Sequence, residues 1–126
     1  MLMMRQLGYI TDRAEQDLFF PERDKVTGQP TGMMIRQKKD LFGFADWVAA
    51  RANEPGTVYG QSTTVSHQAN RMAKILASPM APILLQAGNR ILVHGWVKRQ
   101  RNKQTFWEVT EREVFYRGQQ LIVEQV

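Results

Sequence analysis

The chain has 126 residues, a net charge of +5 and 43% hydrophobic residues, which is typical of one globular domain, here residues 1–126. It contains no cysteine and only two histidines, so disulfides, thiolate zinc sites and cysteine nucleophiles are excluded, and any metal would be bound mainly by oxygen atoms. No apolar run approaches the roughly 20 residues that span a bilayer, and the N-terminus lacks a signal-peptide pattern, so we expect a protein that is neither membrane-bound nor secreted.

The first half of the chain predicts a short helix followed by extended segments. In chain order we expect a helix over residues 1–7, an extended segment over 8–20 and a loop or hairpin tip over 21–32. A segment at 33–37 could pair with the residues before Asp40. After it we expect a strand over 42–52, a turn over 53–56 and a short strand over 57–61. The alternation within 42–52 places Asp46 on the same face as Phe44 and Val48.

In the second half, the spacing of the apolar residues first becomes helical. An apolar stripe from Ala69 to Leu76 predicts a helix over residues 66–77, which Thr64 or Ser66 could cap. After it we expect a helical turn or two at 81–87, a strand at 90–98, a polar turn at 99–104 and closing strands at 106–115 and 120–126. This order predicts an α+β fold with a mixed β-sheet and a helix packed on one face.

Two aspartates lie among apolar residues in the middle of the chain. Asp46 falls inside a predicted strand, where aspartate is disfavoured, and burial of a lone carboxylate is costly unless it is paired, hydrogen-bonded or bound to a metal. The alternative is that Asp46 forms a salt bridge or lies on an exposed face. For Asp40 a purely structural role is the stronger explanation, because an aspartate before Leu-Phe-Gly can stabilise a turn.

A polar group on the next strand could meet Asp46. If the turn at residues 53–56 joins two antiparallel strands, Asp46 and Gln61 lie near each other at the strand ends, and Thr63 points to the same face as Gln61. The alternative is a polar strand end that leads into a helix cap.

The predicted helix that follows carries His67, Arg71 and Lys74 at a spacing that places them on one face. A basic helix face beside carboxylates suits phosphate binding, because arginine can contact two phosphate oxygens at once. The alternative is an ordinary solvated face.

A second basic cluster, formed by Lys98, Arg99, Arg101 and Lys103, lies in the predicted turn at residues 99–104 and its edges. It could contact a nucleic-acid backbone or simply keep an exposed turn soluble. The three tryptophans are interpreted as core residues or cross-strand partners rather than base-stacking platforms. The net positive charge suits a polyanionic partner but also occurs in proteins without one.

Taken in order, these residues resemble the PD-(D/E)XK nuclease superfamily, to which Holliday junction resolvases and many restriction endonucleases belong. Four segments, residues 38–50, 60–64, 69–75 and 89–96, also look like a group of small, mostly phage-associated proteins of unassigned function on that fold. The resemblance covers about residues 8–107. It implies a restriction-endonuclease-like core, a cytoplasmic location in a bacterial or phage-infected host cell, and a homodimer as in resolvase-like relatives.

In that superfamily a motif aspartate and an acidic residue of the next strand bind a divalent metal, and a lysine two residues on helps to activate the attacking water. The resemblance matches Asp46 to the motif aspartate, Gln61 to the second acidic position and Thr63 to the lysine position. Glu15 is the candidate for an upstream glutamate, and Asp40 is a candidate additional ligand. Asp40 and Asp46 would then hold Mg²⁺ or Mn²⁺.

Gln61 and Thr63 depart from the superfamily pattern. A glutamine oxygen can ligate a metal but brings no negative charge, and threonine cannot supply a cation. Lys38, Arg71 or Lys74 could replace the missing lysine from another backbone position. Without such a replacement, the fold would serve for binding alone.

Three hypotheses follow. The first is a divalent-metal-dependent endonuclease that acts on DNA, with branched and single-stranded DNA among its possible substrates. The second is a non-catalytic nucleic-acid-binding or accessory protein on a nuclease fold. The third is a structural or protein-interaction module whose basic charge is incidental.

Overall fold

The structure is a computed structural model that describes residues 2–125. Its helices are α1 (Leu2–Gln6), the short 3₁₀ turn η1 (Val65–His67), α2 (Gln68–Leu76) and α3 (Met80–Gln86). Its strands are β1 (Ile10–Arg13), β2 (Gln16–Arg23), β3 (Pro30–Lys39), β4 (Trp47–Ala50), β5 (Val58–Thr64), β6 (Arg90–Arg101), β7 (Gln104–Arg117) and β8 (Gln120–Gln125). Within these residues, no helix combines the length and the apolar character needed to cross a membrane.

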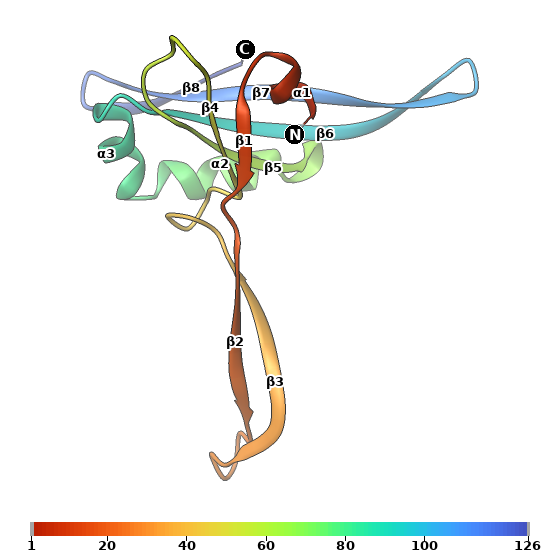
Figure 1. Cartoon of the computed structure of the whole chain (residues 1–126), viewed down its shortest axis with the longest axis vertical. Coiled ribbons are helices and arrows are strands. Elements are labelled where there is room, and N and C mark those ends of the chain that lie inside the picture. The colour runs from red at the N-terminus through yellow and green to blue at the C-terminus, as the bar shows by residue number, and fades with distance from the viewer. Residues whose placement is uncertain (1, 126) are drawn as a thin grey trace.

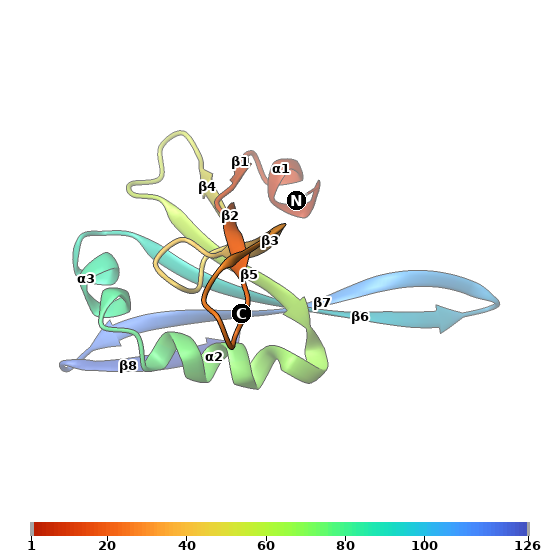
Figure 2. The same cartoon turned by 90° about the horizontal axis from the view of Figure 1, so that it is seen from below.

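Six strands form one mixed sheet in the order β1-β4-β5-β6-β7-β8 (Figures 1 and 2). Strands β5 and β6 are parallel, and the other neighbours are antiparallel. A parallel pair needs a long crossover connection, and α2 with α3 supplies it between β5 and β6. The predicted α+β fold with a mixed sheet is thereby confirmed.

Helices cover both faces of this sheet. On one face, α2 and α3 pack against β6 and β7 through a core that includes Met72, Ile75, Leu84, Ile91 and Val114. On the opposite face, α1 contributes Met4 to a second core with residues that include Tyr9, Trp47, Val58 and Leu92. The sequence predicted helical cover on one face only, because a helix of five residues is too short to reveal an apolar stripe.

The extended segment predicted for residues 8–20 is divided between two sheets. Strand β1 pairs with β4 in the main sheet, whereas β2 pairs only with β3 and forms a ribbon that projects from the body, here called the β2–β3 arm (Figure 1). The loop is shorter than the predicted residues 21–32, because β2 continues to Arg23 and β3 begins at Pro30. Every residue of β3 is exposed. Local alternation predicts extended backbone but does not say which strand it will pair with.

The strand predicted over residues 42–52 begins only at Trp47. The chain first makes a tight turn, in which Phe42 and Gly43 have φ angles of 55° and 80° and Leu41 bridges to Ala45. Positive φ is favourable for glycine and uncommon for a bulky residue, so the apolar alternation through this stretch was misleading. The turn brings Asp40 back beside Asp46.

The hairpin between β6 and β7 is much longer than predicted. Cross-strand pairing continues to Arg101 and Gln104, so the polar turn predicted over residues 99–104 contracts to Asn102 and Lys103. Both turn residues have positive φ, as two-residue hairpin loops require. Of the basic residues of this region, Lys98, Arg99 and Arg101 therefore lie on β6, and Lys103 lies in the turn.

Candidate functional site

Asp46 is held by the backbone of two neighbouring strands. Its N–H donates to the Gly60 carbonyl at 2.9 Å, and its carbonyl accepts from the Ala14 N–H at 3.0 Å. The carboxylate oxygens accept from the Ser62 N–H at 3.2 and 3.3 Å, and the Gln61 amide donates to one of them at 3.4 Å. The expected proximity of Asp46 and Gln61 is confirmed, because β4 and β5 are antiparallel neighbours.

Trp47 fixes the position of Asp46 by packing against the next strand. Its ring lies over Gly60, where any Cβ would overlap the indole. Its Nε1–H also donates to the Ser62 hydroxyl at 3.0 Å. A glycine at position 60 therefore lets the strands approach closely enough for the Asp46 carboxylate to reach the backbone of Ser62.

The electrostatic surroundings of Asp46 are unfavourable to its charge. Burial, together with the negative charges of Asp40 and Glu15, raises the pKa of Asp46 to about 6, while the Ser62 N–H opposes the shift. Within residues 2–125, no lysine or arginine forms a salt bridge with Asp46. The simple explanation of a structural ion pair is therefore not supported for this residue.

Asp46 opens into a cleft of about 510 Å³ on the side of the sheet that carries α2, here called the α2-side cleft. Its lining combines four cations with three carboxylates: Lys38, Lys39, Arg71 and Lys74 with Glu15, Asp40 and Asp46, together with Gly43, Gln61 and Ser62. Asp46, Asp40, Glu15 and Gln61 thus line the same cleft.

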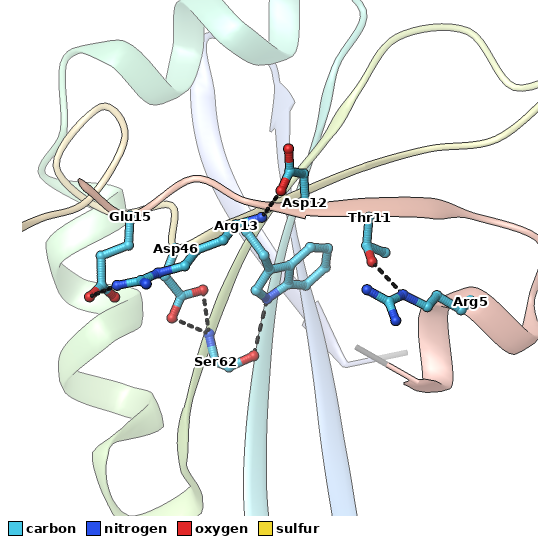
Figure 3. A pocket seen from close by; sticks show the side chains of 8 residues that line it. Arg5, Thr11, Asp12, Arg13, Glu15, Asp46 and Ser62 are labelled. Atoms are coloured by element: carbon cyan, nitrogen blue, oxygen red, sulfur yellow. Dashed lines mark hydrogen bonds and ion pairs between the residues drawn. The ribbon is translucent and has the colours of Figure 1, made fainter. Parts of the chain in front are cut away.

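A second cleft of about 460 Å³ reaches Asp46 from the side of β1, and Figure 3 shows its lining residues. Glu15, Asp46 and Ser62 line both clefts, so the two spaces meet at the Asp46 carboxylate. Arg5 and Arg13 line this β1-side cleft, and Arg13 forms an ion pair with Glu15 at 3.3 Å (Figure 3). Cations therefore flank the central carboxylates on both sides.

Several residues predicted for the site lie outside this lining. Thr63 shares a face with Gln61 by strand alternation, but it does not line either cleft. His67 belongs to η1 rather than α2, and its Nδ1 pairs with the Thr64 hydroxyl at 2.8 Å. The basic residues Lys98, Arg99 and Arg101 lie on the distant hairpin.

Some cleft residues were not predicted from the sequence. Arg5 and Arg13 come from α1 and β1, and Lys39 comes from the end of β3. The Lys-Lys-Asp run at residues 38–40 was a usable signal for Lys39. No local pattern marks Arg5 or Arg13, because only the tertiary fold brings α1 and β1 beside β4.

The residues at the junction offer oxygen donors only, which suits magnesium or manganese. Within residues 2–125, no group of three or more histidine, aspartate or glutamate side chains is arranged to hold a metal ion. Magnesium requires only one or two protein carboxylates, because water and substrate phosphate complete its coordination. Asp46 and Asp40, with Glu15 lining the same cleft, fit that requirement in chemistry.

A histidine and a serine also approach each other on the opposite face, but they do not form a nucleophile–base pair. His94 is fully buried, and its Nε2 pairs with Glu111 at 2.8 Å. The Ser62 hydroxyl instead accepts from Trp47, and in the part of the chain that the structure describes His94 Nδ1 has no partner. Hydrolysis through a serine nucleophile has no support here.

No protein-family model, curated protein or solved structure matches this chain. The resemblance to the PD-(D/E)XK superfamily therefore stays a prediction.

Proposed function

We propose that the protein is a divalent-metal-dependent endonuclease that acts on DNA. The observation that carries this proposal is Asp46: a half-buried carboxylate that pairs with no cation of residues 2–125, placed between two cation-lined clefts. Burial of an unpaired carboxylate costs folding free energy, and carboxylates of this kind cluster at functional sites. A divalent cation would supply the missing charge.

Asp46 and Asp40 would hold the metal, with Glu15 as the further carboxylate of the α2-side cleft. When bound, Mg²⁺ or Mn²⁺ activates water and stabilises the charge that develops on the phosphate. Gln61 keeps the Asp46 carboxylate oriented through its amide N–H. The Ser62 N–H has the same effect and leaves the other lone pairs of the carboxylate available.

Arg71 and Lys74 would bind the DNA backbone. They lie on α2 and line the cleft that contains Asp46. Thr63 occupies the position at which the superfamily has a lysine. Lys38 is the best replacement for that lysine, because it lines the same cleft and its Nζ lies 3.5 Å from the Glu15 carboxylate. It could hold a phosphate oxygen or orient water beside the metal ligands.

The chain order supports a restriction-endonuclease-like core as part of the proposal. Asp46 precedes β4, β5 carries Gln61, α2 carries the basic residues, and β6 returns parallel to β5. This is the succession on which the family resemblance rests.

A non-catalytic DNA-binding protein is the second candidate. It is favoured by the absence, within residues 2–125, of a three-carboxylate metal group and by the loss of the acidic-x-Lys pair at Gln61 and Thr63. In this case the same cations would bind the backbone, but no bond would be cleaved.

The test is a cleavage assay on branched, single-stranded and duplex DNA in Mg²⁺ or Mn²⁺. We expect cleavage by the wild type and a loss of at least about 100-fold in Asp46→Ala, because the metal ligand is removed. Asp24→Ala is the matched control, since Asp24 lies outside both clefts and its carboxylate accepts from the Val26 and Thr27 N–H groups at the tip of the β2–β3 arm.

Unchanged cleavage in Asp46→Ala would show that the site assignment is wrong. Salt-sensitive DNA binding without cleavage of any substrate would instead favour the second candidate.

A further inference from the structure

The hairpin of β6 and β7 extends well beyond the sheet (Figures 1 and 2). Strand β5 accompanies β6 only as far as Trp96, and β8 pairs with β7 only from Arg112 onward. Residues 97–108 therefore pair only with each other, and we call them the β6–β7 extension. From Lys98 to Glu108 all of them are exposed.

The extension combines cations with aromatic rings. Trp107 is 62% exposed and Phe106 is 41% exposed. The register places Lys98 opposite Trp107 and Arg99 opposite Phe106, and directly opposed residues share a face of a β-ribbon. Each face of the extension therefore presents one aromatic ring opposite a cation. The face of Phe106 also carries Arg101 and Glu108, and Glu108 pairs with Arg99 at 3.6 Å. A tryptophan was expected in the core or in a cross-strand pair, and Trp107 occupies an exposed pair with a lysine.

This combination suits a nucleic acid with unpaired bases. Proteins that bind single strands place successive bases on aromatic side chains and hold the backbone with neighbouring cations. A duplex offers the same phosphates but keeps the faces of its bases stacked inside. Cations alone would serve either substrate, whereas the exposed rings add binding energy only where bases are free.

The distance between the β6–β7 extension and the α2-side cleft would let one nucleic-acid strand contact both. Gln61 pairs with Val93 of β6, and Lys98 is five residues further along the same strand. At about 3.3 Å per residue this separation is roughly 17 Å. Stacked nucleotides advance about 3.4 Å each, so the extension would meet a strand about five nucleotides from a phosphate held beside Asp46.

We infer that the β6–β7 extension binds unpaired bases, with Trp107 and Phe106 as stacking partners and Lys98 and Arg99 as phosphate contacts. This inference rests on the proposed function and narrows its substrate to DNA that contains a single-stranded region. The extension recognises the unpaired segment, and the cleft around Asp46 holds the phosphodiester a few nucleotides away.

The experiment measures binding without cleavage. An Asp46→Asn protein in EDTA is titrated with a labelled single-stranded oligonucleotide and with the same sequence as a duplex. We expect Trp107→Ala to weaken single-strand binding by about 10-fold or more and duplex binding by less than about 2-fold. Trp107→Phe should retain most of the affinity, because a smaller ring still stacks.

Phe19→Ala provides the matched control. Phe19 is 61% exposed on the other projecting ribbon, and it also lies opposite a cation, Arg36. It should leave both affinities unchanged. Tryptophan fluorescence supplies a second readout, because bound single strand should shield Trp107 from acrylamide while Trp47 is already buried.

Equal losses on single strand and duplex, or no loss in Trp107→Ala, would overturn the inference. A Trp107-dependent association with anionic phospholipid vesicles, without single-strand binding, would also overturn it and assign the extension to a membrane surface. Because the assay contains no metal, absence of cleavage by the wild type would count against the nuclease proposal alone.

Discussion

Two polar clusters of this protein differ in whether their carboxylates are paired with cations. At one end of β6, Arg90 pairs with Glu113 at 2.9 Å and with Glu54 at 2.7 Å, and Glu54 also accepts a hydrogen bond from Tyr9. Just before β4, the Asp46 carboxylate accepts, among residues 2–125, only from the Ser62 N–H and the Gln61 amide, and its neighbours Asp40 and Glu15 are also acidic.

The pKa values follow this difference. Hydrogen bonds from Tyr9, Arg90 and Arg51 lower the pKa of Glu54 to about 2 despite partial burial, whereas burial raises the pKa of Asp46 to about 6. A cluster that satisfies its own charges stabilises the fold. A cluster that leaves a charge uncompensated is prepared for an external cation, and this contrast separates a structural ion pair from a candidate site.

The largest expected effect comes from breaking the satisfied cluster. Arg90→Ala leaves Glu113, which is 7% exposed, without its partner, so we expect a loss of about 3 kcal/mol in the free energy of unfolding. Urea denaturation measures the loss. Arg117→Ala is the control, because its pair with Glu124 is exposed and should contribute less than about 1 kcal/mol. Equal losses in the two variants would contradict the structural role of Arg90.

A second substitution tests how the fold positions Asp46. Gly60→Ala forces a methyl group into the Trp47 ring, so we expect a loss of about 2 kcal/mol in the free energy of unfolding. Trp47→Leu in the same protein should relieve part of that loss, which a double-mutant cycle would detect as coupling between the two positions. Strict additivity of the two changes would argue against the close approach of β4 and β5.

Added metal should stabilise the fold only through the uncompensated cluster around Asp46. At pH 8, Mg²⁺ at ten times its Kd is expected to stabilise the fold by about 1.4 kcal/mol. At pH 5 the gain should be much smaller, because Asp46 with a pKa of about 6 is then mostly protonated and a proton competes with the metal. Thermal unfolding with and without EDTA measures both values. An undiminished gain in Asp46→Asn would assign the metal to another site.

The smallest expected effect is a stabilisation. The folded-state pKa of Asp46 lies above the ordinary value of 3.8, so its ionised form destabilises the fold at pH 7. Asp46→Asn should therefore raise the free energy of unfolding by about 1 kcal/mol at pH 7, after allowance for solvent screening. The difference should vanish as the pH falls well below 3.8, where the wild-type carboxyl is protonated in both states.

Glu54 should show the opposite pH dependence. Its pKa is lowered in the folded state, so its contribution is present above its ordinary pKa of 4.5 and is lost as the pH falls towards 2. Denaturation curves of Asp46→Asn and Glu54→Gln across pH 2 to 8 would separate the two behaviours. A destabilised Asp46→Asn at pH 7 would mean that Asp46 is a structural residue.

Much of the site's location could be predicted from the sequence. An aspartate among apolar residues, a turn at residues 53–56 and a strand ending in Gln61 were sufficient to place Asp46 beside Gln61. The helical spacing after residue 66 likewise placed Arg71 and Lys74 on one side of α2, where they line the cleft. These inferences succeeded because each depends on backbone alternation or helical period within a short segment.

Composition and local periodicity were enough to predict the α+β class and the proximity of Asp46 to Gln61, and they led us to expect a metal bound mainly by oxygen atoms. Whether a carboxylate is compensated depended on the tertiary structure. Arg90 reaches Glu54 across 36 positions and Tyr9 across 81, whereas no such cation reaches Asp46 within residues 2–125. Charge pairing depends on distances between side chains that are remote in sequence, and local patterns do not contain those distances.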